Sequence, residues 1–266
     1  MLPKPACYGE QYASAFQERG VVAAYQYRPP YPDSMFALLA DLIADSPRRV
    51  LDVGCGTGFI ARPLVELVGR VDALDVSQAM IEEGRRLPNG DHPRLTWLVG
   101  RAEDAPLTPP YDLITAGDSL HWMDWEVVLP RFARLLAPDG ALAIIQNGQL
   151  PVVQLAGLLP IIQKYSIYGQ AYQPVDLIEE LERRKLFQTQ GAVRTDPVPF
   201  AQSIDAYVES FHGRASLARE RMTPADAAAF DAEVRELVAT YTQDSVELQL
   251  VADIAWGKPL NPAAQG

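Results

Sequence analysis

One stretch of the sequence constrains the fold more than any other: RVLDVGCGTGFIARPL, residues 49–64. A short apolar run ends in Asp52, and three glycines follow at alternate positions, Gly54, Gly56 and Gly58. Glycine carries no Cβ, so the backbone of such a turn can approach a ligand closely. The pattern predicts a buried strand at 49–53, a turn that holds a nucleotide-like cofactor, and a helix over 58–68.

The same strand-then-helix pattern recurs along the first half of the chain. Further strands are expected at 71–76, 94–100, 111–117 and 141–147. Helices are expected around an apolar stripe at 35–43 and over 77–87 and 125–137. We expect Asp33 or Ser34 to cap the first of these helices, Ser77 to open the second, and the turn PDG (138–140) to end the third. This alternation predicts a doubly wound α/β fold, a mostly parallel sheet with helices on both faces.

The second half of the chain has a different pattern. Residues 150–185 look helical, strands are expected at 187–195 and 245–256, and two helices lie between them. The expected organisation follows from these patterns and has five parts. These are an N-terminal cap segment (1–33), a cofactor-binding core (34–149), a helical lid (150–185), a C-terminal part that returns the last two strands to the sheet (186–258), and a tail (259–266).

Composition excludes several classes of protein. The chain has 23 Lys and Arg against 34 Asp and Glu, a formal charge of −11, and its densest basic clusters are RR and RRK. Such a surface repels phosphate backbones, so we expect no nucleic-acid partner. Cys7 and Cys55 form no C-x-x-C pair, and no metal site is expected. No signal peptide is recognised and no apolar run nears the ~18 residues of a membrane helix, which predicts a cytoplasmic protein without membrane contact.

The glycine loop departs from the dinucleotide fingerprint. G-x-G-x-x-G would place its third glycine at Phe59, and no Gly-Lys-Ser/Thr follows for a P-loop. The Asp52 carboxylate would repel a pyrophosphate but suit a ligand with an ammonium group. Asp75 follows Gly54 by 21 residues, where an acid accepts hydrogen bonds from ribose hydroxyls. A ribose and a cation without a pyrophosphate point to S-adenosyl-L-methionine.

Four segments together resemble class I S-adenosylmethionine-dependent methyltransferases. They are VLDVGCGTGFIARPL, VDALDVSQAMIEEGRR, LVGRAEDAPL and YDLITAGDSLHWMDWEVVLPRFARLLAPDGALAI, in the family's order and spacing over residues 21–147. AYQYRPPYP and SLHWMDW are similar to the small-molecule branch that includes trans-aconitate methyltransferase-like enzymes. The resemblance implies a Rossmann-like seven-stranded sheet with its last strand inserted antiparallel, and methyl transfer to a small-molecule substrate.

The resemblance also implies a set of cofactor contacts. The loop of Gly54, Gly56 and Gly58 would hold the methionine part, and Asp75 the ribose. Met80 would pack near the adenine, and Ala102 and Glu103 would meet the adenine edge with a backbone N–H and a carboxylate. Asp118 would face the reacting centre.

Simpler roles remain open for several of these residues. Asp52 could cap the loop, Glu103 could be a solvated acid, and Met80 could be core packing. Cys55 is expected to be a small filler rather than a nucleophile.

The motif RPPYP needs a separate interpretation. It superficially resembles the Asn/Asp-Pro-Pro-Tyr motif of amino-group methyltransferases, but Arg28 cannot accept a hydrogen bond from an amine, and the motif precedes the glycine loop. We expect Arg28 to meet the cofactor's methionine carboxylate and Tyr31 to close over the site next to the substrate. Alternatively, the prolines only set an extended linker.

A general base is needed only if the acceptor is protonated at working pH. His121 directly follows the fourth strand and ranks first as base, with Trp122 as a wall for the acceptor. His212 ranks second, and His92 is expected to be solvated. Two other functions stay open: a cofactor-binding protein with non-methylating chemistry such as a cyclisation, and an NAD-dependent oxidoreductase.

Overall fold

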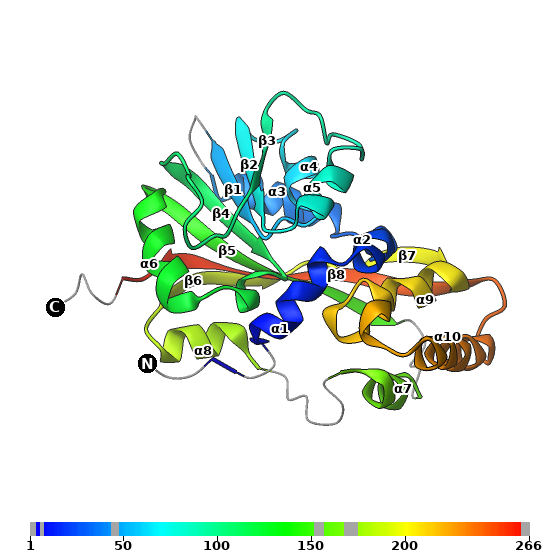
Figure 1. The fold of residues 1–266 in the computed structure, drawn as a ribbon. Coiled ribbons are helices and arrows are strands. Elements are labelled where there is room, and N and C mark those ends of the chain that lie inside the picture. Colours follow the sequence, from blue (N-terminus) through cyan, green and yellow to red (C-terminus); the bar gives the residue numbers. More distant parts are fainter. Residues whose placement is uncertain (1–3, 6–7, 44–47, 152–156, 168–174, 262–266) are drawn as a thin grey trace. The chain divides into compact units, whose positions relative to one another are not determined.

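The computed structural model describes residues 4–5, 8–43, 48–151, 157–167 and 175–261 (Figure 1). The chain forms two compact units, each built from three separate stretches. The first unit comprises Met1–Pro30, Gln149–Pro174 and Pro197–Leu250, and the second comprises Tyr31–Gly148, Val175–Asp196 and Val251–Gly266.

The second unit contains a parallel sheet built from the expected strands. They are β1 (Arg49–Val53), β2 (Arg70–Asp75), β3 (Leu95–Val99), β4 (Tyr111–Gly117) and β5 (Leu136–Pro151). The strand order is β3-β2-β1-β4-β5-β8-β6, and β6 (Phe187–Arg194) runs antiparallel to β8 (Ser245–Pro259). This seven-strand path, with an antiparallel strand inserted near its end, confirms the fold predicted from the sequence.

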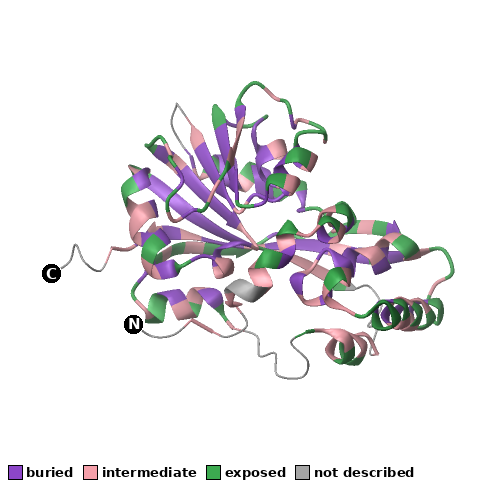
Figure 2. Cartoon of the chain, in the orientation of Figure 1, coloured by how far each residue is buried: buried purple, intermediate pink, exposed green. Residues whose placement is uncertain are grey.

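The central strands of the second unit's sheet are buried on both faces, whereas the edge strands β3 and β6 are more exposed (Figure 2). On one face, side chains of α3 (Asp33–Asp41) and α4 (Ala61–Leu64) join Val50 and Val71 in a single core cluster. Four consecutive residues of β1, Val50 to Val53, are buried, as expected for strands covered from both sides. The remaining helices of this unit are α5 (Gln78–Gly84), α6 (Trp125–Leu135), α8 (Leu177–Arg183) and the 3-10 turn η3 (Leu120–Trp122).

Strand register brings the loops of interest to one edge of this sheet. Asp52 of β1 lies opposite Ala73 of β2 and Thr115 of β4, and all three strands are parallel. Asp75, the last residue of β2, lies opposite Val99 of β3. The glycine loop and the segments that follow β2, β3 and β4 therefore leave the sheet at its carboxyl edge, where ligands bind in such folds.

Several local expectations in this unit need correction. Helix α3 begins at Asp33, with Pro32 as the capping residue and no side-chain cap, so neither Asp33 nor Ser34 caps it. The helix expected at 58–68 is α-helical only over Ala61–Leu64, because the glycine turn continues to Gly58 at φ +79°. Ser77 does open α5, since its Oγ accepts the Met80 N–H at 3.3 Å.

The turn PDG (138–140) does not end helix α6 as expected. Strand β5 already begins at Leu136, which pairs with Tyr111. The next pair in the ladder is Leu113 with Ala141, so residues 137–140 form an irregularity. The turn-forming residues are thus accommodated as a bulge next to β4.

The first unit packs helices beside a two-stranded ladder. Its helices are α1 (Glu10–Ala13), α2 (Arg19–Tyr25), α7 (Leu158–Tyr165), α9 (Ile204–His212) and α10 (Pro224–Ala239), with 3-10 turns η2 (Ser14–Gln17), η5 (Ala215–Leu217) and η6 (Arg219–Arg221). Strand β7 (Val198–Ser203) pairs antiparallel with residues 245–250 of β8. The sequence did not predict β7, since it contains Pro199 and is mostly exposed.

The two units do not follow the expected boundaries. Helix α7 belongs to the first unit and α8 to the second, so the described helices of segment 150–185 do not form one body. Parts of the expected lid (152–156 and 168–174), of the cap segment (1–3 and 6–7, with Cys7) and of the tail (262–266) lie outside the described residues. Within the described stretches, no helix has the length and apolar character needed to cross a membrane.

Candidate functional site

The glycine loop is held in a conformation that requires glycine. Gly54, Gly56 and Gly58 have φ values of +64°, +55° and +79°, a region that L side chains rarely adopt. The N–H groups of Gly54 and Cys55 both donate to the Leu74 carbonyl, at 2.8 and 3.0 Å. A Cβ at Gly54 would lie 2.5 Å from the Ser119 Cβ. The loop is therefore fixed against the end of β2 and the segment after β4. Cys55 is a buried free cysteine, as its expected role as a filler requires.

Asp75 joins this loop to helix α5. Its Oδ2 accepts the Gly56 N–H and its Oδ1 accepts the Ser77 N–H, each at 2.8 Å. Burial raises the pKa of Asp75, and the N–H groups of Ser77 and Gly56 oppose that rise. A carboxylate has about four acceptor sites, so the two oxygens retain capacity for further donors. This arrangement can accept hydrogen bonds from a pair of ligand hydroxyls.

Asp52 is a buried carboxylate whose hydrogen bonding is incomplete. Its Oδ1 accepts the Thr115 hydroxyl at 2.8 Å, whereas Oδ2 finds no hydrogen-bond partner within the described part of the chain. Burial raises the pKa of Asp52 to about 7, against opposing effects of Thr115 and the Ala61 N–H. The Thr57 hydroxyl, also in this loop, is a second buried polar atom without a partner there. Two such atoms beside a glycine turn fit a polar ligand.

Residues around the end of β2 divide into buried and exposed apolar side chains. Met80 is 1% exposed and belongs to the interior, which favours its simpler role in core packing. Val76, which follows Asp75, is 47% exposed, and Val99 at the end of β3 is 51% exposed. Val76 is thus an accessible apolar surface beside the Asp75 carboxylate, which was not predicted from the sequence.

The Glu103 carboxylate is mostly buried and has protein partners. Its Oε1 accepts the Asp124 N–H at 2.9 Å, and its Oε2 lies 3.5 Å from the Arg101 guanidinium. Its side chain is 15% exposed, and the preceding Ala102 is buried. The carboxylate expected to meet an adenine amine therefore already binds the start of α6.

Tyr31 and Asp118 both lie near the end of β4. A Cβ at Gly117 would lie 2.7 Å from the Tyr31 hydroxyl oxygen, so this tyrosine contacts the last residue of the strand. Asp118 follows at φ +47°, and its N–H donates to the Ile145 carbonyl at 2.9 Å. Arg28 belongs to the first unit, where its guanidinium lies 5.0 Å from the centre of the Tyr25 ring.

His121 and Trp122 lie on the short turn η3 after β4. Their rings are 4.4 Å apart between centroids and tilted by 54°, and both side chains are partly exposed. The turn is fixed from the following helix, because the Trp125 indole N–H donates to the Leu120 carbonyl at 2.8 Å. The guanidinium of Arg184, on the segment after α8, covers the Trp125 ring at 5.2 Å. This geometry keeps an imidazole at the carboxyl edge of the sheet.

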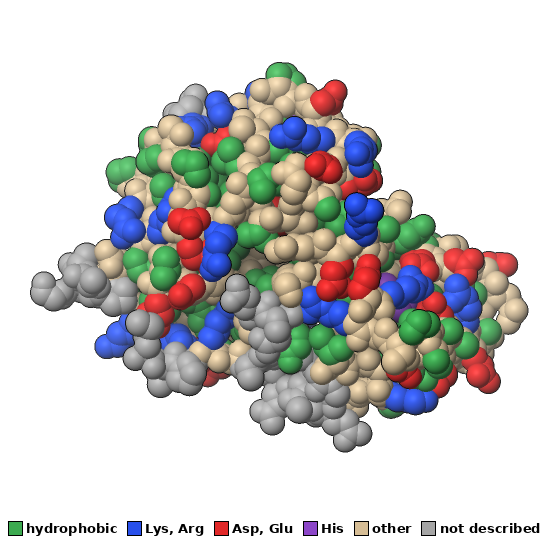
Figure 3. All heavy atoms as spheres, viewed as in Figure 1, with side chains coloured by type: hydrophobic (Ala, Val, Ile, Leu, Met, Phe, Trp, Pro, Cys, Tyr) green, Lys and Arg blue, Asp and Glu red, His purple; other side chains and the backbone are tan. Residues whose placement is uncertain are grey.

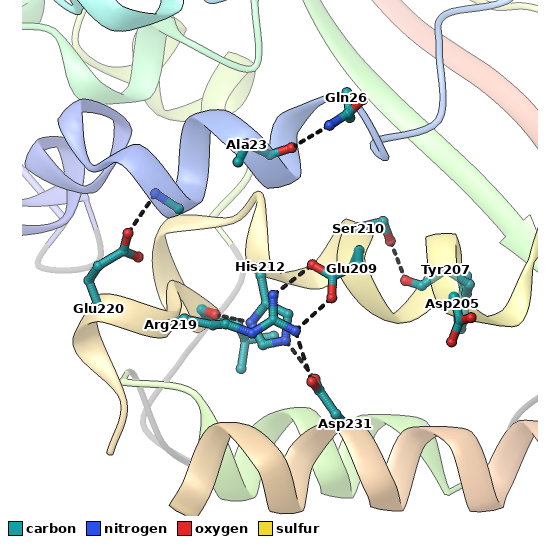
Figure 4. A network of polar contacts seen from close by, with 12 residues as sticks. Ala23, Gln26, Asp205, Tyr207, Glu209, Ser210, His212, Arg219, Glu220 and Asp231 are labelled. Carbon is teal, nitrogen blue, oxygen red and sulfur yellow. Dashed lines mark hydrogen bonds and ion pairs between the residues drawn. The ribbon is translucent and has the colours of Figure 1, made fainter. Parts of the chain in front are cut away.

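His212 occupies a very different environment in the first unit (Figure 4). It is 1% exposed, its Nδ1 lies 2.7 Å from the Leu217 carbonyl, and its Nε2 lies 2.7 Å from Asp231 Oδ1. Arg219 binds the other Asp231 oxygen at 2.8 Å and holds Glu209 through two hydrogen bonds. The carbonyl and the carboxylate thus engage both ring nitrogens. The structure therefore argues against His212 as a general base and favours a structural role.

Comparisons with known proteins agree with this fold. Residues 50–140 match the family model described as "Methyltransferase domain". An uncharacterized methyltransferase of Mycobacterium bovis is 35% identical over 128 residues, 47% of this chain and 50% of that protein. Trans-aconitate 2-methyltransferase of Methylobacterium radiotolerans is 41% identical over 117 residues, 40% of this chain and 41% of that protein. The chain thus spans about half the length of the curated relatives it matches.

Solved structures share the fold over most of the chain. A candidate type II methyltransferase from Anaeromyxobacter dehalogenans aligns with a TM-score of 0.65 at 24% identity, over 87% of this chain and 97% of that one. A SAM-dependent methyltransferase from Geobacter sulfurreducens, solved with S-adenosyl-L-homocysteine, aligns with a TM-score of 0.54 at 16% identity, over 98% and 100% of the two chains. Residues 50–140 therefore match a methyltransferase domain, and the sheet around them has the fold of class I methyltransferases.

Proposed function

We propose that this protein transfers a methyl group from S-adenosyl-L-methionine to a small-molecule acceptor. The observation that carries the proposal is the arrangement of Asp75, whose carboxylate is locked by two N–H groups beside a glycine turn and retains acceptor capacity. The match of residues 50–140 to a methyltransferase domain supports it. The Geobacter neighbour solved with S-adenosyl-L-homocysteine supports the choice of cofactor.

The residues near the glycine loop fit such a cofactor. We assign the ribose hydroxyls to Asp75 and an apolar contact with the base to Val76 rather than to Met80, because Val76 is exposed and Met80 is buried. The orphaned oxygen of Asp52 and the hydroxyl of Thr57 suit a ligand with cationic and polar groups. When bound, the cofactor supplies an electrophilic methyl group on a sulfonium, so the protein has mainly to orient the acceptor and exclude water.

A dinucleotide fits this loop poorly. A pyrophosphate needs the positive end of a helix dipole. Here α4 is four residues long, and the Asp52 carboxylate interacts with the N–H of its first residue, Ala61. A phosphate placed there would meet a buried acid rather than unpaired N–H groups. This supports the methyltransferase proposal over an NAD-dependent oxidoreductase.

A small acceptor is favoured over nucleic acid. The chain carries a formal charge of −11, and on the face drawn in Figure 3 the Lys and Arg side chains lie among Asp and Glu side chains. Trans-aconitate 2-methyltransferase, a relative by sequence, is named for a small-molecule substrate. We therefore propose a cytoplasmic enzyme in which Tyr31, Trp122 and His121 meet the acceptor, with His121 as base where the acceptor is a hydroxyl or phenol.

Isothermal titration calorimetry with S-adenosyl-L-homocysteine tests the cofactor site. Wild-type protein should bind, and Asp75→Ala should weaken binding by roughly 1.5–3 kcal/mol, the scale of a hydrogen bond to a charged group. Glu82→Ala serves as the control, since Glu82 is an exposed acid on the adjacent helix α5. No binding by the wild type, or unchanged affinity in Asp75→Ala, would refute the assignment.

A further inference from the structure

The segment between β3 and β4 lacks regular structure but is held at both of its sides. At its start, the Gly100 N–H donates to the Asp75 carbonyl at 2.9 Å, which ties the segment to the residue assigned to the ribose. A turn follows in which the Ala105 N–H donates to the Arg101 carbonyl at 2.9 Å. Residues 102–105 project beyond the ladder, so other contacts must set their orientation.

Helix α6 supplies these contacts through one side chain. Arg131 donates from Nη1 to the Glu103 carbonyl at 2.8 Å and from Nη2 to the Ala105 carbonyl. The N–H of Asp124, the residue that caps α6, donates to the Glu103 carboxylate at 2.9 Å. The same helix therefore holds the main chain and the side chain of the segment.

We propose that Arg131 is a positioning residue for the base of the cofactor, a role that rests on the proposed function. It binds the carbonyls of Glu103 and Ala105, on either side of Asp104, with one planar group, and so fixes peptides 103–104 and 105–106. The peptide that carries the Ala102 N–H shares its plane with the Arg101 carbonyl, which accepts the Ala105 N–H, so this turn passes the constraint on to Ala102. The Ala102 N–H is then aimed at a fixed point beyond β3, where it can donate to the N1 acceptor of adenine. A Lys ammonium is a point donor and cannot reproduce this fork.

Arg131 lies outside the hydrophobic core, so its proposed positioning role can be tested separately from core packing. Its side chain is only part-buried, whereas the neighbouring Leu129 and Phe132 are fully buried. Glu103 is partly exposed and Asp104 is exposed, so water can replace the guanidinium at the Glu103 carbonyl, whereas Ala105 is buried. Loss of Arg131 should therefore cost little stability but leave the segment to be ordered when the cofactor binds, at the expense of affinity.

The experiment compares two ligands that differ only at the base edge. S-adenosyl-L-homocysteine offers an N1 acceptor, whereas S-inosyl-L-homocysteine carries an N1–H donor that opposes the Ala102 N–H. Wild-type protein should prefer the adenine ligand. Arg131→Met should bind it about 10-fold more weakly, the scale of ordering a short segment, and the preference over the inosine ligand should fall toward one. Arg134→Met is the matched control, an exposed arginine on the same helix.

Each outcome decides the proposal. Arg131→Lys should restore little of the base preference, since one ammonium cannot hold both carbonyls. Equal losses for both ligands in Arg131→Met, or unchanged affinity, would overturn the positioning role. So would loss of the thermal unfolding transition in both Arg131 variants, which would make the residue structural. If wild-type protein binds neither ligand, the proposed function itself fails; if it binds both equally, only the role of Arg131 fails.

Discussion

The partly buried Asp231 of the first unit and the buried Asp52 and Asp75 of the second have pKa values shifted in opposite directions. In the first unit, burial alone would raise the pKa of Asp231, but hydrogen bonds from His212 and Arg219 lower it overall. In the second unit, Asp52 and Asp75 have raised pKa values, mainly because they are buried, and their hydrogen bonds come from hydroxyl and N–H groups. The first arrangement is internally balanced, whereas the second favours the arrival of a donor or a cation.

Whether the polar partners of a residue are complete distinguishes structural from functional residues better than residue type does. His212 and His121 were both candidate bases, yet only His121 lies partly exposed at the carboxyl edge of the sheet. Both ring nitrogens of His212 are held by Leu217 and Asp231, and its ring packs edge-on against Phe230, with 5.5 Å between the ring centroids. A charged group whose partners are complete stabilises the fold, while one whose partners are incomplete indicates a ligand.

The largest expected effect is a loss of stability when the network of His212, Asp231 and Arg219 in the first unit is broken. His212→Phe keeps a ring against Phe230 but leaves the Leu217 carbonyl and one Asp231 oxygen without their donor. We expect a loss of roughly 2–4 kcal/mol in the free energy of unfolding, because unpaired buried acceptors cost about 1–3 kcal/mol each. Chemical denaturation at pH 7 measures this, and affinity for S-adenosyl-L-homocysteine should stay unchanged at temperatures where the variant is folded.

His92→Phe provides the control for this comparison. The His92 Nδ1 accepts the Arg94 N–H at 3.1 Å in a turn, its Nε2 lies 4.0 Å from Glu66 Oε1, and its side chain is 19% exposed. Its replacement should change stability by less than about 0.5 kcal/mol, as surface substitutions usually do. Equal losses in the two variants would show that the network around His212 is not special.

Much of the fold could be predicted because its signals are local and periodic. The strands at 49–53 and 111–117 have the predicted bounds, and Ser77 caps its helix as predicted. β7 was missed because its partner, the first half of β8, lies more than forty residues away along the chain and its own side chains are largely exposed. Such a strand is defined by pairing, which no local pattern reveals.

The site could be predicted only in part, for a related reason. Asp75 could be proposed as a ribose acceptor because its distance from Gly54 is a property of the chain, and the structure adds that its two oxygens bind Gly56 and Ser77. The engagement of Glu103 by Asp124 depends on how α6 packs, so the sequence suggested an acceptor where the structure has a partner. Val76 carried a usable signal, an apolar residue directly after a strand-ending acid, but only its exposure distinguishes it from Met80.

A second prediction tests the exposed histidine against the buried one. His121→Ala should lower kcat by about 10²-fold or more with a hydroxyl or phenol acceptor, the usual scale for removing a general base. The affinity for S-adenosyl-L-homocysteine and the free energy of unfolding should barely change, the reverse of His212→Phe. Steady-state methyl transfer with the physiological acceptor, together with calorimetry, provides both measurements.

The smallest expected effect is a change in stability with pH when the charge of Asp52 is removed. In the ligand-free protein, the raised pKa of Asp52 means that the folded state binds more protons than the unfolded state between about pH 4 and pH 7. This carboxyl therefore reduces stability as pH rises through that window and remains destabilising above it. Asp52→Asn keeps an acceptor for the Thr115 hydroxyl but removes the charge, so we expect it to raise the free energy of unfolding by about 1 kcal/mol at pH 8 and by less at pH 5.

Asp231→Asn should act in the opposite direction. The lowered pKa of Asp231 means that its charge stabilises the fold above its ordinary pKa and that this contribution is lost only as pH falls through the lower, folded-state pKa. Removing the charge at pH 8 should therefore lower stability, whereas removing the charge of Asp52 should raise it. Thermal unfolding of the two variants at pH 5 and pH 8 gives both signs in one experiment. If Asp52→Asn lost stability at pH 8 as Asp231→Asn does, Asp52 would be a balanced structural acid, and the reason for placing a cationic ligand beside it would disappear.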